Sequence, residues 1–212
     1  SDFFDEEARA VFDAVADLVA GAIHFARMAD DLQQANRKLE QLSMIDGLTG
    51  IANRRRFDQQ LCVDWRRMAA EGRPLALLMV DADAFKPLND AAGHLYGDEC
   101  LRELARICNG FADGDNDLVG RFGGEELVLL LPGRDLAAAT AIAEALRIAV
   151  EAQAMPHPAS PVSAHVTVSV GVAVAVPAAA RPPERLIAAA DRAMYAAKLQ
   201  GRNRVCVAGA ES

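Results

Sequence analysis

The chain has 212 residues, of which 52% are hydrophobic and 25% charged, as in ordinary soluble globular proteins. Its formal net charge of −8 argues against a nucleic-acid-binding protein, because phosphate backbones are bound by clustered Lys and Arg. No apolar run reaches the roughly 18 to 20 residues that span a bilayer, so we expect no transmembrane segment in this chain. We expect no signal peptide, and the four cysteines include no CxxC pair, which predicts reduced, buried thiols in a cytoplasmic protein.

Residues 5–44 carry a seven-residue repeat of apolar side chains. One seam is Val11, Leu18, Phe25, Leu32 and Leu39, and the second is Ala14, Gly21, Met28, Ala35 and Leu42. This repeat predicts a long N-terminal helix that forms a two-stranded coiled coil. The alternative is a helix packed against its own domain. We place the domain boundary near Ser43, with a helical linker at 1–43 and a main domain at 44–212, and the start at Ser1 predicts a piece of a longer protein.

After Ser43 the pattern changes to short elements of mixed type. Helices are predicted at 53–71, 97–108, 136–152 and 184–199, and a short one near 85–90. Strands are predicted at 75–80, 117–121, 126–131, 165–176 and 204–207. Because the glycine pair between the second and third strands predicts a hairpin, at least one strand pair is antiparallel. The order of elements predicts an α+β fold, a mixed sheet covered by helices.

Two aspartates, Asp81 and Asp83, directly follow the apolar strand predicted at 75–80. Carboxylates at the end of a buried strand are costly unless they are used. The alternative is that one of them caps the following short helix, and this alternative applies more to Asp83 than to Asp81.

A second acidic pair, Glu125 and Glu126, directly follows Gly123 and Gly124. Neighbouring strand residues face opposite ways, so we expect only one of the two glutamates to point easily at a site shared with Asp81. One carboxylate from each of two strand ends suits Mg²⁺, which takes one or two protein carboxylates plus substrate phosphates.

Phosphate-binding motifs of other classes are missing from the sequence. There is no GxxxxGK[ST], no GxGxxG after a strand and no HExxH, and the histidines have no zinc-ligand spacing. Basic residues that could meet a triphosphate occur instead at Lys198 and Arg202, around the end of the last predicted helix. Taken alone, such a pair would more often be a solvated surface feature.

Four motifs occur in order along residues 43 to 207. They are residues 46–55 (DGLTGIANRR), 81–98 (DADAFKPLND, then GH and GD), 123–127 (GGEEL) and 193–203 (AMYAAK, then GRN). Together they resemble the GGDEF-domain diguanylate cyclases, in the GGEEF variant of the signature with Leu127 in place of the final Phe. The resemblance implies a nucleotidyl-cyclase-like (ferredoxin-like) fold, with a mainly antiparallel central sheet flanked by helices.

The resemblance also implies a role for each matching position. Divalent metal would be held by Asp81, the carbonyl of Ala82 and Glu125, and Glu125 would also be the catalytic base. GTP would be bound by Asn89 and Asp98 at the guanine, by Lys198 and Arg202 at the terminal phosphates, and by main-chain amides around Phe85 and Lys86. His94, Arg121 and Glu126 match motif positions with less defined roles.

The implied reaction condenses two GTP into cyclic di-GMP and releases two pyrophosphates, in bacterial second-messenger signalling. The implied cofactor is Mg²⁺, for which Mn²⁺ could substitute. Two domains must face each other, so we expect a homodimer joined through the N-terminal helix and transiently across the active sites. The N-terminal helix would pass on a signal from an upstream sensory domain. No nucleic-acid partner is expected. The alternatives are a catalytically silent GTP- or cyclic-dinucleotide-binding sensor, and a cyclase with another base preference.

One departure concerns product inhibition. Many members of the family carry an RxxD site whose Asp lies six residues before the first signature glycine. Here Asp117 retains the acidic position, but Gly114 replaces the arginine. We therefore expect weak or absent product inhibition by that route.

Overall fold

The computed structural model describes residues 11, 27–28, 44–112, 116–178 and 181–209. The chain divides into two units, Ser1–Ser43 and Met44–Ser212. In the first unit Val11, Arg27 and Met28 are described, and all three are helical and exposed. The rest of the predicted coiled coil lies outside the described residues, except for Met44 at its end, which is not helical. None of the described helices is long and apolar enough to cross a bilayer.

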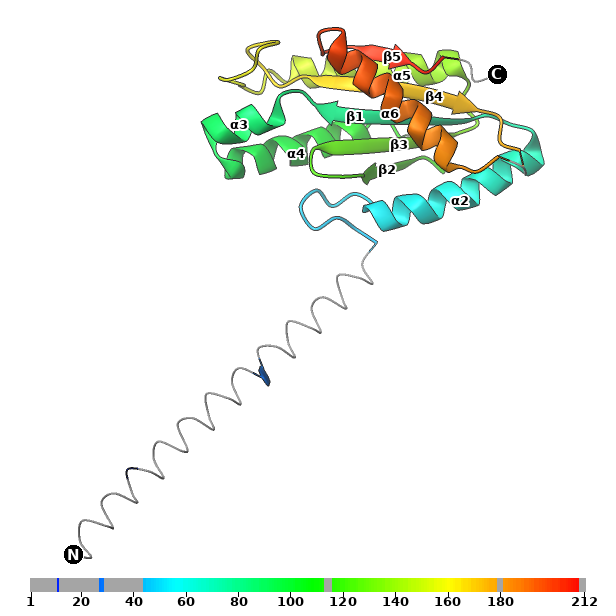
Figure 1. Cartoon of the computed structure of the whole chain (residues 1–212), viewed down its shortest axis with the longest axis horizontal. Helices are drawn as coiled ribbons and strands as arrows, with labels where there is room; N and C mark the ends of the chain where they lie inside the picture. Colours follow the sequence, from blue (N-terminus) through cyan, green and yellow to red (C-terminus); the bar gives the residue numbers. More distant parts are fainter. Residues whose placement is uncertain (1–10, 12–26, 29–43, 113–115, 179–180, 210–212) are drawn as a thin grey trace, which may run out of the picture. The chain divides into compact units, whose positions relative to one another are not determined.

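The second unit is built on a five-stranded sheet with the order β2-β3-β1-β4-β5 (Figure 1). Its strands are β1 (Leu75–Ala82), β2 (Leu118–Arg121), β3 (Glu126–Pro132), β4 (Val168–Ala175) and β5 (Val205–Val207). β1 lies in the centre and pairs antiparallel with both β3 and β4, whereas β5 pairs parallel with β4. The predicted mixed, mainly antiparallel sheet is therefore confirmed.

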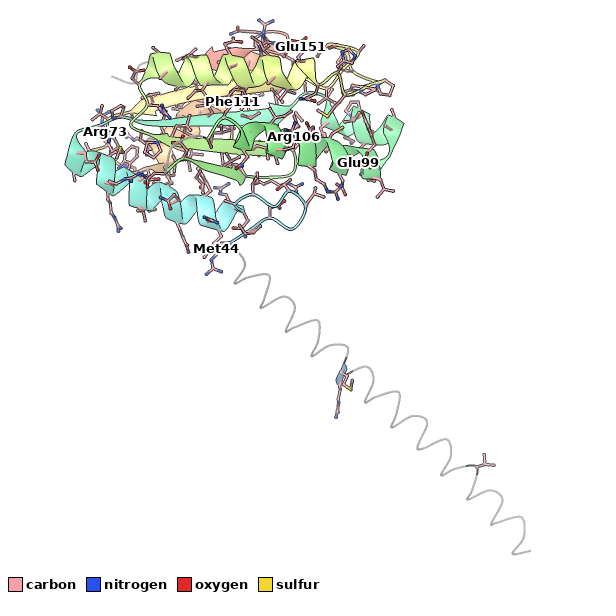
Figure 2. All side chains as sticks on the ribbon, turned by 180° about the vertical axis from the view of Figure 1, so that it is seen from behind. Met44, Arg73, Glu99, Arg106, Phe111 and Glu151 are labelled. Carbon is pink, nitrogen blue, oxygen red and sulfur yellow. The ribbon has the colours of Figure 1, made fainter. Side chains whose placement is uncertain are left out.

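Helices cover both faces of this sheet. They are α2 (Arg54–Glu71), α3 (Phe85–Ala92), α4 (His94–Asn109), α5 (Leu136–Ala152) and α6 (Glu184–Leu199). Alternate β1 side chains divide between two cores: Leu78 and Val80 lie with apolar residues of α3, α4 and α5, whereas Leu77 and Met79 lie with those of α2 and α6. Figure 2 shows the face covered by α4 and α5. Because both of its faces are covered, β1 is buried along its whole length.

Helix boundaries follow from caps that are visible in the sequence. The Asn53 side chain accepts a hydrogen bond from the Arg56 amide at the start of α2, and Gly72, with φ 62°, ends that helix. The Asp135 side chain caps α5 in the same way by accepting from the Ala138 amide. The predicted bounds of α5 and α6 match the observed ones.

Two boundaries differ from the prediction by three residues. The helix expected at 97–108 begins at His94, because Gly93, with φ 87°, ends α3 and starts α4 without a side-chain cap. The strand expected at 165–176 begins only at Val168, because His165 instead forms an isolated bridge with Pro156.

Helix α6 lies unusually close to β4. A Cβ atom added at Gly171 would overlap the Ala190 carbonyl oxygen and the Met194 amide nitrogen, and would lie 2.9 Å from the Met194 Cα. Only glycine allows this approach, so Gly171 fixes the height of α6, and with it Lys198, above the sheet.

Candidate functional site

The two acidic motifs meet at one end of the central strands. In the β1–β3 register Asp81 lies opposite Glu126, and the Ala82 amide donates to the Glu125 carbonyl over 3.4 Å. The preceding turn is closed by the Phe122 amide, which donates to the Glu126 carbonyl over 2.8 Å. Strand pairing thus places the two acidic motifs side by side, as their positions at strand ends predict.

Asp81 is the buried centre of this acidic group, with 3% of its surface exposed. Burial raises the pKa of the Asp81 carboxyl to about 6; the Lys198 ammonium works against this rise, and the negative charges of Glu125 and Glu126 add to it. The Lys198 Nζ lies 2.7 Å from Asp81 Oδ2. Three carboxylates and one ammonium therefore share a single local field.

Glu125 and Glu126 both lie close enough to Asp81 for their negative charges to raise its pKa, and the expectation that one of them points more easily at the shared site stays a prediction. β3 begins only at Glu126, so Glu125 belongs to the turn. Glu126 also reaches toward the turn, since a Cβ at Gly123 would lie 2.7 Å from its Oε2 atom.

The donor set suits a metal ion that arrives with its substrate. In the part of the chain that the structure describes, no group of three or more His, Cys, Asp or Glu side chains could hold a metal by itself. Mg²⁺ commonly needs only one or two protein carboxylates, because substrate phosphates and waters supply the other ligands. Asp81 and Glu125 meet that requirement, and the Lys198 ammonium lies 2.7 Å from Asp81 Oδ2.

A second polar group lies where α3 meets α4. The Asn89 Oδ1 atom is buried and has no hydrogen-bond partner among the described residues. A Cβ at Gly97 would overlap this oxygen and would lie 3.2 Å from the Phe85 ring, so glycine at this position leaves room for the Asn89 amide. Asp98 is the next residue on α4, and His94 is exposed at the start of that helix. An unpaired buried acceptor beside a carboxylate suits a ligand that offers N–H groups.

The loop from β1 to α3 has a strained conformation at Ala84. This residue has φ 54° in the left-handed region and precedes the first α3 amides, those of Phe85 and Lys86. The buried His157 supports the loop, because its Nε2 atom lies 3.1 Å from the Ala84 carbonyl oxygen. Amides at a helix start attract anions, which is compatible with the phosphate contact expected there.

Asp83 does not cap α3, so that alternative is wrong for this residue. Ala84 occupies the cap position and makes no side-chain cap bond. The Asp83 carboxylate is buried and accepts hydrogen bonds from the Thr167 and Ser169 hydroxyls and from the Asn203 amide. Sequence reasoning missed this use of Asp83; the one signal was that Asn203 belongs to the closing GRN motif.

Arg121 supports the signature turn. Its Nε and Nη2 atoms donate to the Gly124 carbonyl over 3.0 and 2.7 Å, and its Nη1 lies 3.2 Å from Asp46 Oδ1. Asp46 also accepts from the Thr49 hydroxyl over 2.7 Å. Partial burial works to raise the pKa of Asp46, but the Thr49 hydrogen bonds and the Arg121 charge outweigh it, and the pKa is lowered. Arg121 thus joins the first motif to the third.

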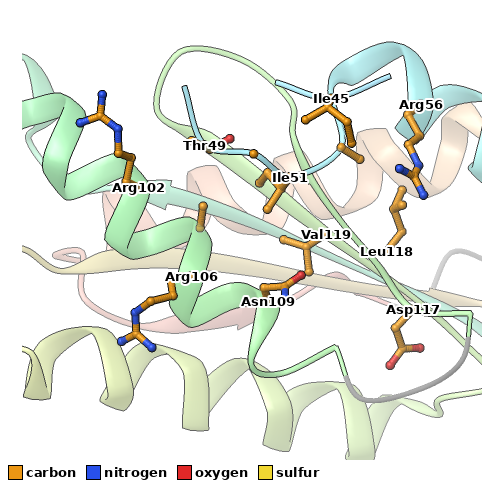
Figure 3. A pocket seen from close by; sticks show the side chains of 13 residues that line it. Ile45, Thr49, Ile51, Arg56, Arg102, Arg106, Asn109, Asp117, Leu118 and Val119 are labelled. Carbon is orange, nitrogen blue, oxygen red and sulfur yellow. The ribbon is translucent and has the colours of Figure 1, made fainter. Parts of the chain in front are cut away.

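The remains of the product-inhibition motif lie away from this site. Gly114 lies outside the described residues, and Asp117 Oδ2 is 3.7 Å from the Arg134 Nη2. Asp117 also lines a surface pocket of about 430 Å³ with Arg56 and Arg102, among others (Figure 3). That lining includes none of the acidic site residues.

Comparisons with known proteins agree with this architecture. The family model described as diguanylate cyclase, GGDEF domain, matches residues 43–204. The bifunctional diguanylate cyclase/cyclic di-GMP phosphodiesterase MucR of Pseudomonas aeruginosa is 37% identical over 181 residues, which cover 84% of this chain and 25% of MucR. Diguanylate cyclase VdcA of Vibrio cholerae is 34% identical over 189 residues, 89% of this chain and 52% of VdcA. The chain thus spans a quarter to about half of these relatives.

A solved structure matches almost the whole chain. The coiled coil and GGDEF domain of DgcB from Caulobacter crescentus, in complex with c-di-GMP, is 29% identical with a TM-score of 0.71, covering 91% of this chain and 98% of that one. GGDEF domains bind GTP, act as dimers and use divalent metal ions. The ordered motifs, the sheet and the matched residues lead to one conclusion: this chain belongs to the GGDEF-domain family of diguanylate cyclases.

Proposed function

We propose that this chain is a diguanylate cyclase that condenses two GTP into cyclic di-GMP and releases two pyrophosphates. The observation that carries the proposal is the acidic group itself. Asp81 at the end of β1, the Glu125–Glu126 pair before and at the start of β3, and Lys198 from α6 share one field. Such an arrangement of opposite charges suits phosphoryl transfer, in which positioning and charge stabilisation supply most of the catalysis.

Glu125 is the proposed base. It takes the proton from the ribose 3′-hydroxyl of one GTP, so that the 3′-oxygen attacks the α-phosphorus of the other. A bond forms between that oxygen and the phosphorus, the bond from the phosphorus to the bridging oxygen breaks, and pyrophosphate leaves. Mg²⁺, or Mn²⁺ in its place, would be held by Asp81, Glu125 and the Ala82 carbonyl, and would offset the negative charge of the phosphates.

Asn89 and Asp98 are the proposed readers of the guanine. The unpaired Asn89 Oδ1 offers an acceptor, and the Asp98 carboxylate can accept from the N1–H and the amino group. Adenine lacks this set of donors, so its binding would leave buried acceptors unpaired. Sites built on such hydrogen bonds reject the wrong analogue by about 10⁴-fold or more.

Lys198 and Arg202 are proposed to hold the terminal phosphates, together with the amides of Phe85 and Lys86. Lys198 Nζ lies 2.7 Å from Asp81 Oδ2, so its ammonium lies beside the proposed metal position. A cation fixed there needs little rearrangement when a triphosphate binds.

Two copies of the chain complete the proposed reaction. Each copy supplies one acidic group and one guanine site, whereas the cyclic product requires two nucleotides in opposite orientation. The predicted coiled coil at 5–44 would keep two domains at high effective concentration and transmit a signal from an upstream sensory domain. A cytoplasmic setting is part of this proposal, since GTP is the substrate.

The test is product analysis with a matched pair of variants. Wild type, Glu125→Gln and Glu184→Gln are incubated with Mg²⁺ and either GTP or ATP, and products are identified by mass spectrometry. Glu184 is exposed in the first turn of α6, away from the acidic group, and serves as the control. We expect cyclic di-GMP from wild type and the control, and a loss of about 10²- to 10⁴-fold in Glu125→Gln.

Each other outcome contradicts a stated part of the proposal. GTP binding without any product would indicate a silent nucleotide sensor. A cyclic product from ATP would indicate another base preference. Undiminished activity in a demonstrably monomeric sample would refute the need for two copies.

A further inference from the structure

The proposed reaction leaves one buried carboxylate of the site without a task. Asp83 lies two residues beyond Asp81, just past the end of β1, and 1% of its surface is exposed. A carboxylate this deeply buried is retained only where its charge is well solvated by the protein. Its partners therefore indicate what it does.

Three donors surround the Asp83 carboxylate. The Ser169 hydroxyl donates to Oδ1 over 2.6 Å, and the Thr167 hydroxyl donates to Oδ2 over 2.8 Å. The third donor is the main-chain amide of Asn203, 120 residues away in sequence and 3.0 Å from Oδ2. Because two donors come from the β4 side and one from the turn after α6, Asp83 joins the end of β1 to that turn.

The turn after α6 has an unusual backbone. Three consecutive residues, Gly201, Arg202 and Asn203, have φ values of 112°, 64° and 45°. Residues other than glycine rarely adopt this backbone region. The Arg202 amide donates to the Ala197 carbonyl over 3.0 Å, and the next amide is the one held by Asp83. Arg202 is thus fixed between α6 on one side and Asp83 on the other.

A second anchor comes from α5. The Asn203 side chain accepts from the Arg147 Nη1 over 2.9 Å and donates to the Glu151 Oε1 over 3.0 Å. Arg147 also donates to Glu151 Oε2 over 3.0 Å, so the three side chains form a closed set. Glu151 lies at the end of α5 (Figure 2). Both the main chain and the side chain of Asn203 are therefore held.

We propose that Asp83 and Asn203 are positioning residues that set the place of Arg202 relative to Asp81. This inference rests on the proposed function, in which Arg202 holds the terminal phosphates. Asp81 and Asp83 lie two residues apart at the end of β1. The Asp81 carboxylate is the proposed metal ligand, and the Asp83 carboxylate fixes the main chain beside the phosphate-binding Arg202. The distance between the two parts of the site is thereby set from a single strand end.

The test compares two ligands that differ at the phosphates Arg202 would hold. Calorimetry measures the affinity for GMP and for a GTP analogue with a methylene group between the α- and β-phosphates, which cannot react. We expect Asp83→Ala to lower the affinity for the analogue by about tenfold or more, and the affinity for GMP by less than about twofold. The same selective loss is expected of Arg202→Ala. The double variant should lose no more than either single one, because Asp83 acts through Arg202.

Further variants separate positioning from general stability. Asp83→Asn should retain near wild-type affinity, because its amide oxygen can still accept from the Asn203 amide while its NH₂ donates to a rotated Ser169 hydroxyl. Asp64→Ala, which removes another fully buried aspartate, is the matched control. It should lower the stability of the fold without changing the affinity for the analogue relative to that for GMP. If Asp83→Ala does not fold, Asn203→Gly keeps the positive φ, loses the α5 anchor and should show the same selective loss.

The outcomes separate this inference from the proposed function. A wild-type chain that does not bind the GTP analogue refutes the proposed function. If the wild-type chain binds the analogue, three results would refute only the positioning role. They are an Asp83→Ala affinity equal to that of wild type, an equal loss of affinity for both ligands, and a loss that adds to that of Arg202→Ala in the double variant.

Discussion

The close contact between α6 and β4 predicts a large effect for a single added methyl group. In Gly171→Ala the new Cβ would overlap main-chain atoms of Ala190 and Met194, which cannot rotate away as a side chain could. Because Cβ contacts under 3.0 Å are essentially never observed, α6 must move by about 1 Å. Overpacking costs about 1–3 kcal/mol, and a clash against main chain belongs at the upper end, so we expect about 3 kcal/mol of lost stability.

The same shift of α6 should also lower the catalytic rate of the folded protein. Lys198 Nζ lies 2.7 Å from Asp81 Oδ2, and a displacement of about 1 Å would break that contact and cost about 10²-fold in rate. Urea unfolding, followed by the fluorescence of Trp65, the one tryptophan, gives the stability, and the rate of cyclic di-GMP formation gives the activity. Gly47→Ala is the control, because no atom lies within 4 Å of its added Cβ. A Gly171→Ala chain within about 0.5 kcal/mol of wild type would refute the inferred packing.

Three further predictions follow from other contacts. In Gly97→Ala the added Cβ displaces the Asn89 amide, so guanine nucleotide affinity measured by calorimetry should fall by about tenfold or more; unchanged affinity would place the guanine elsewhere. Asp46→Asn should cost about 1–2 kcal/mol in urea unfolding at pH 7. That difference should shrink as the pH falls below 3.8, because the lowered pKa of the folded state makes this stabilisation depend on the ionised carboxylate; a constant difference would contradict the assigned contacts. The exposed Cys62 should react rapidly with Ellman's reagent, whereas Cys108, whose pKa burial raises to about 12, should react only after unfolding.

Local signals made most of the fold predictable. The side chains of Asn53 and Asp135 accept hydrogen bonds from first-turn amides, and the helices that follow them begin within one residue of the prediction. The acidic site was predictable for a related reason, since Asp81 and the glutamates stand beside strongly apolar strands whose pairing brings them together. Where no capping side chain exists, as at Gly93, the predicted boundary was three residues late.

The task of Asp83 could not be deduced from its neighbours. A carboxylate before a short helix is usually a cap, and the residue that excludes this role is an amide donor 120 positions away. The contact of Gly171 with α6 was equally hidden, because a glycine in an apolar strand does not reveal which backbone approaches it. Long-range backbone geometry decided both cases, and a periodic pattern carries no information about it.

The central place of β1 has a consequence for folding. Its two neighbours, β3 and β4, come from widely separated parts of the chain, and β4 joins the sheet only after α5 has been made. Topologies dominated by such non-local pairs fold slowly, because the entropy of closing long loops must be overcome before the contacts form. Lys198 reaches Asp81 from still farther along the chain. The site is therefore complete only when α6 has joined the sheet, and nucleotide binding at full affinity should appear together with the complete fold.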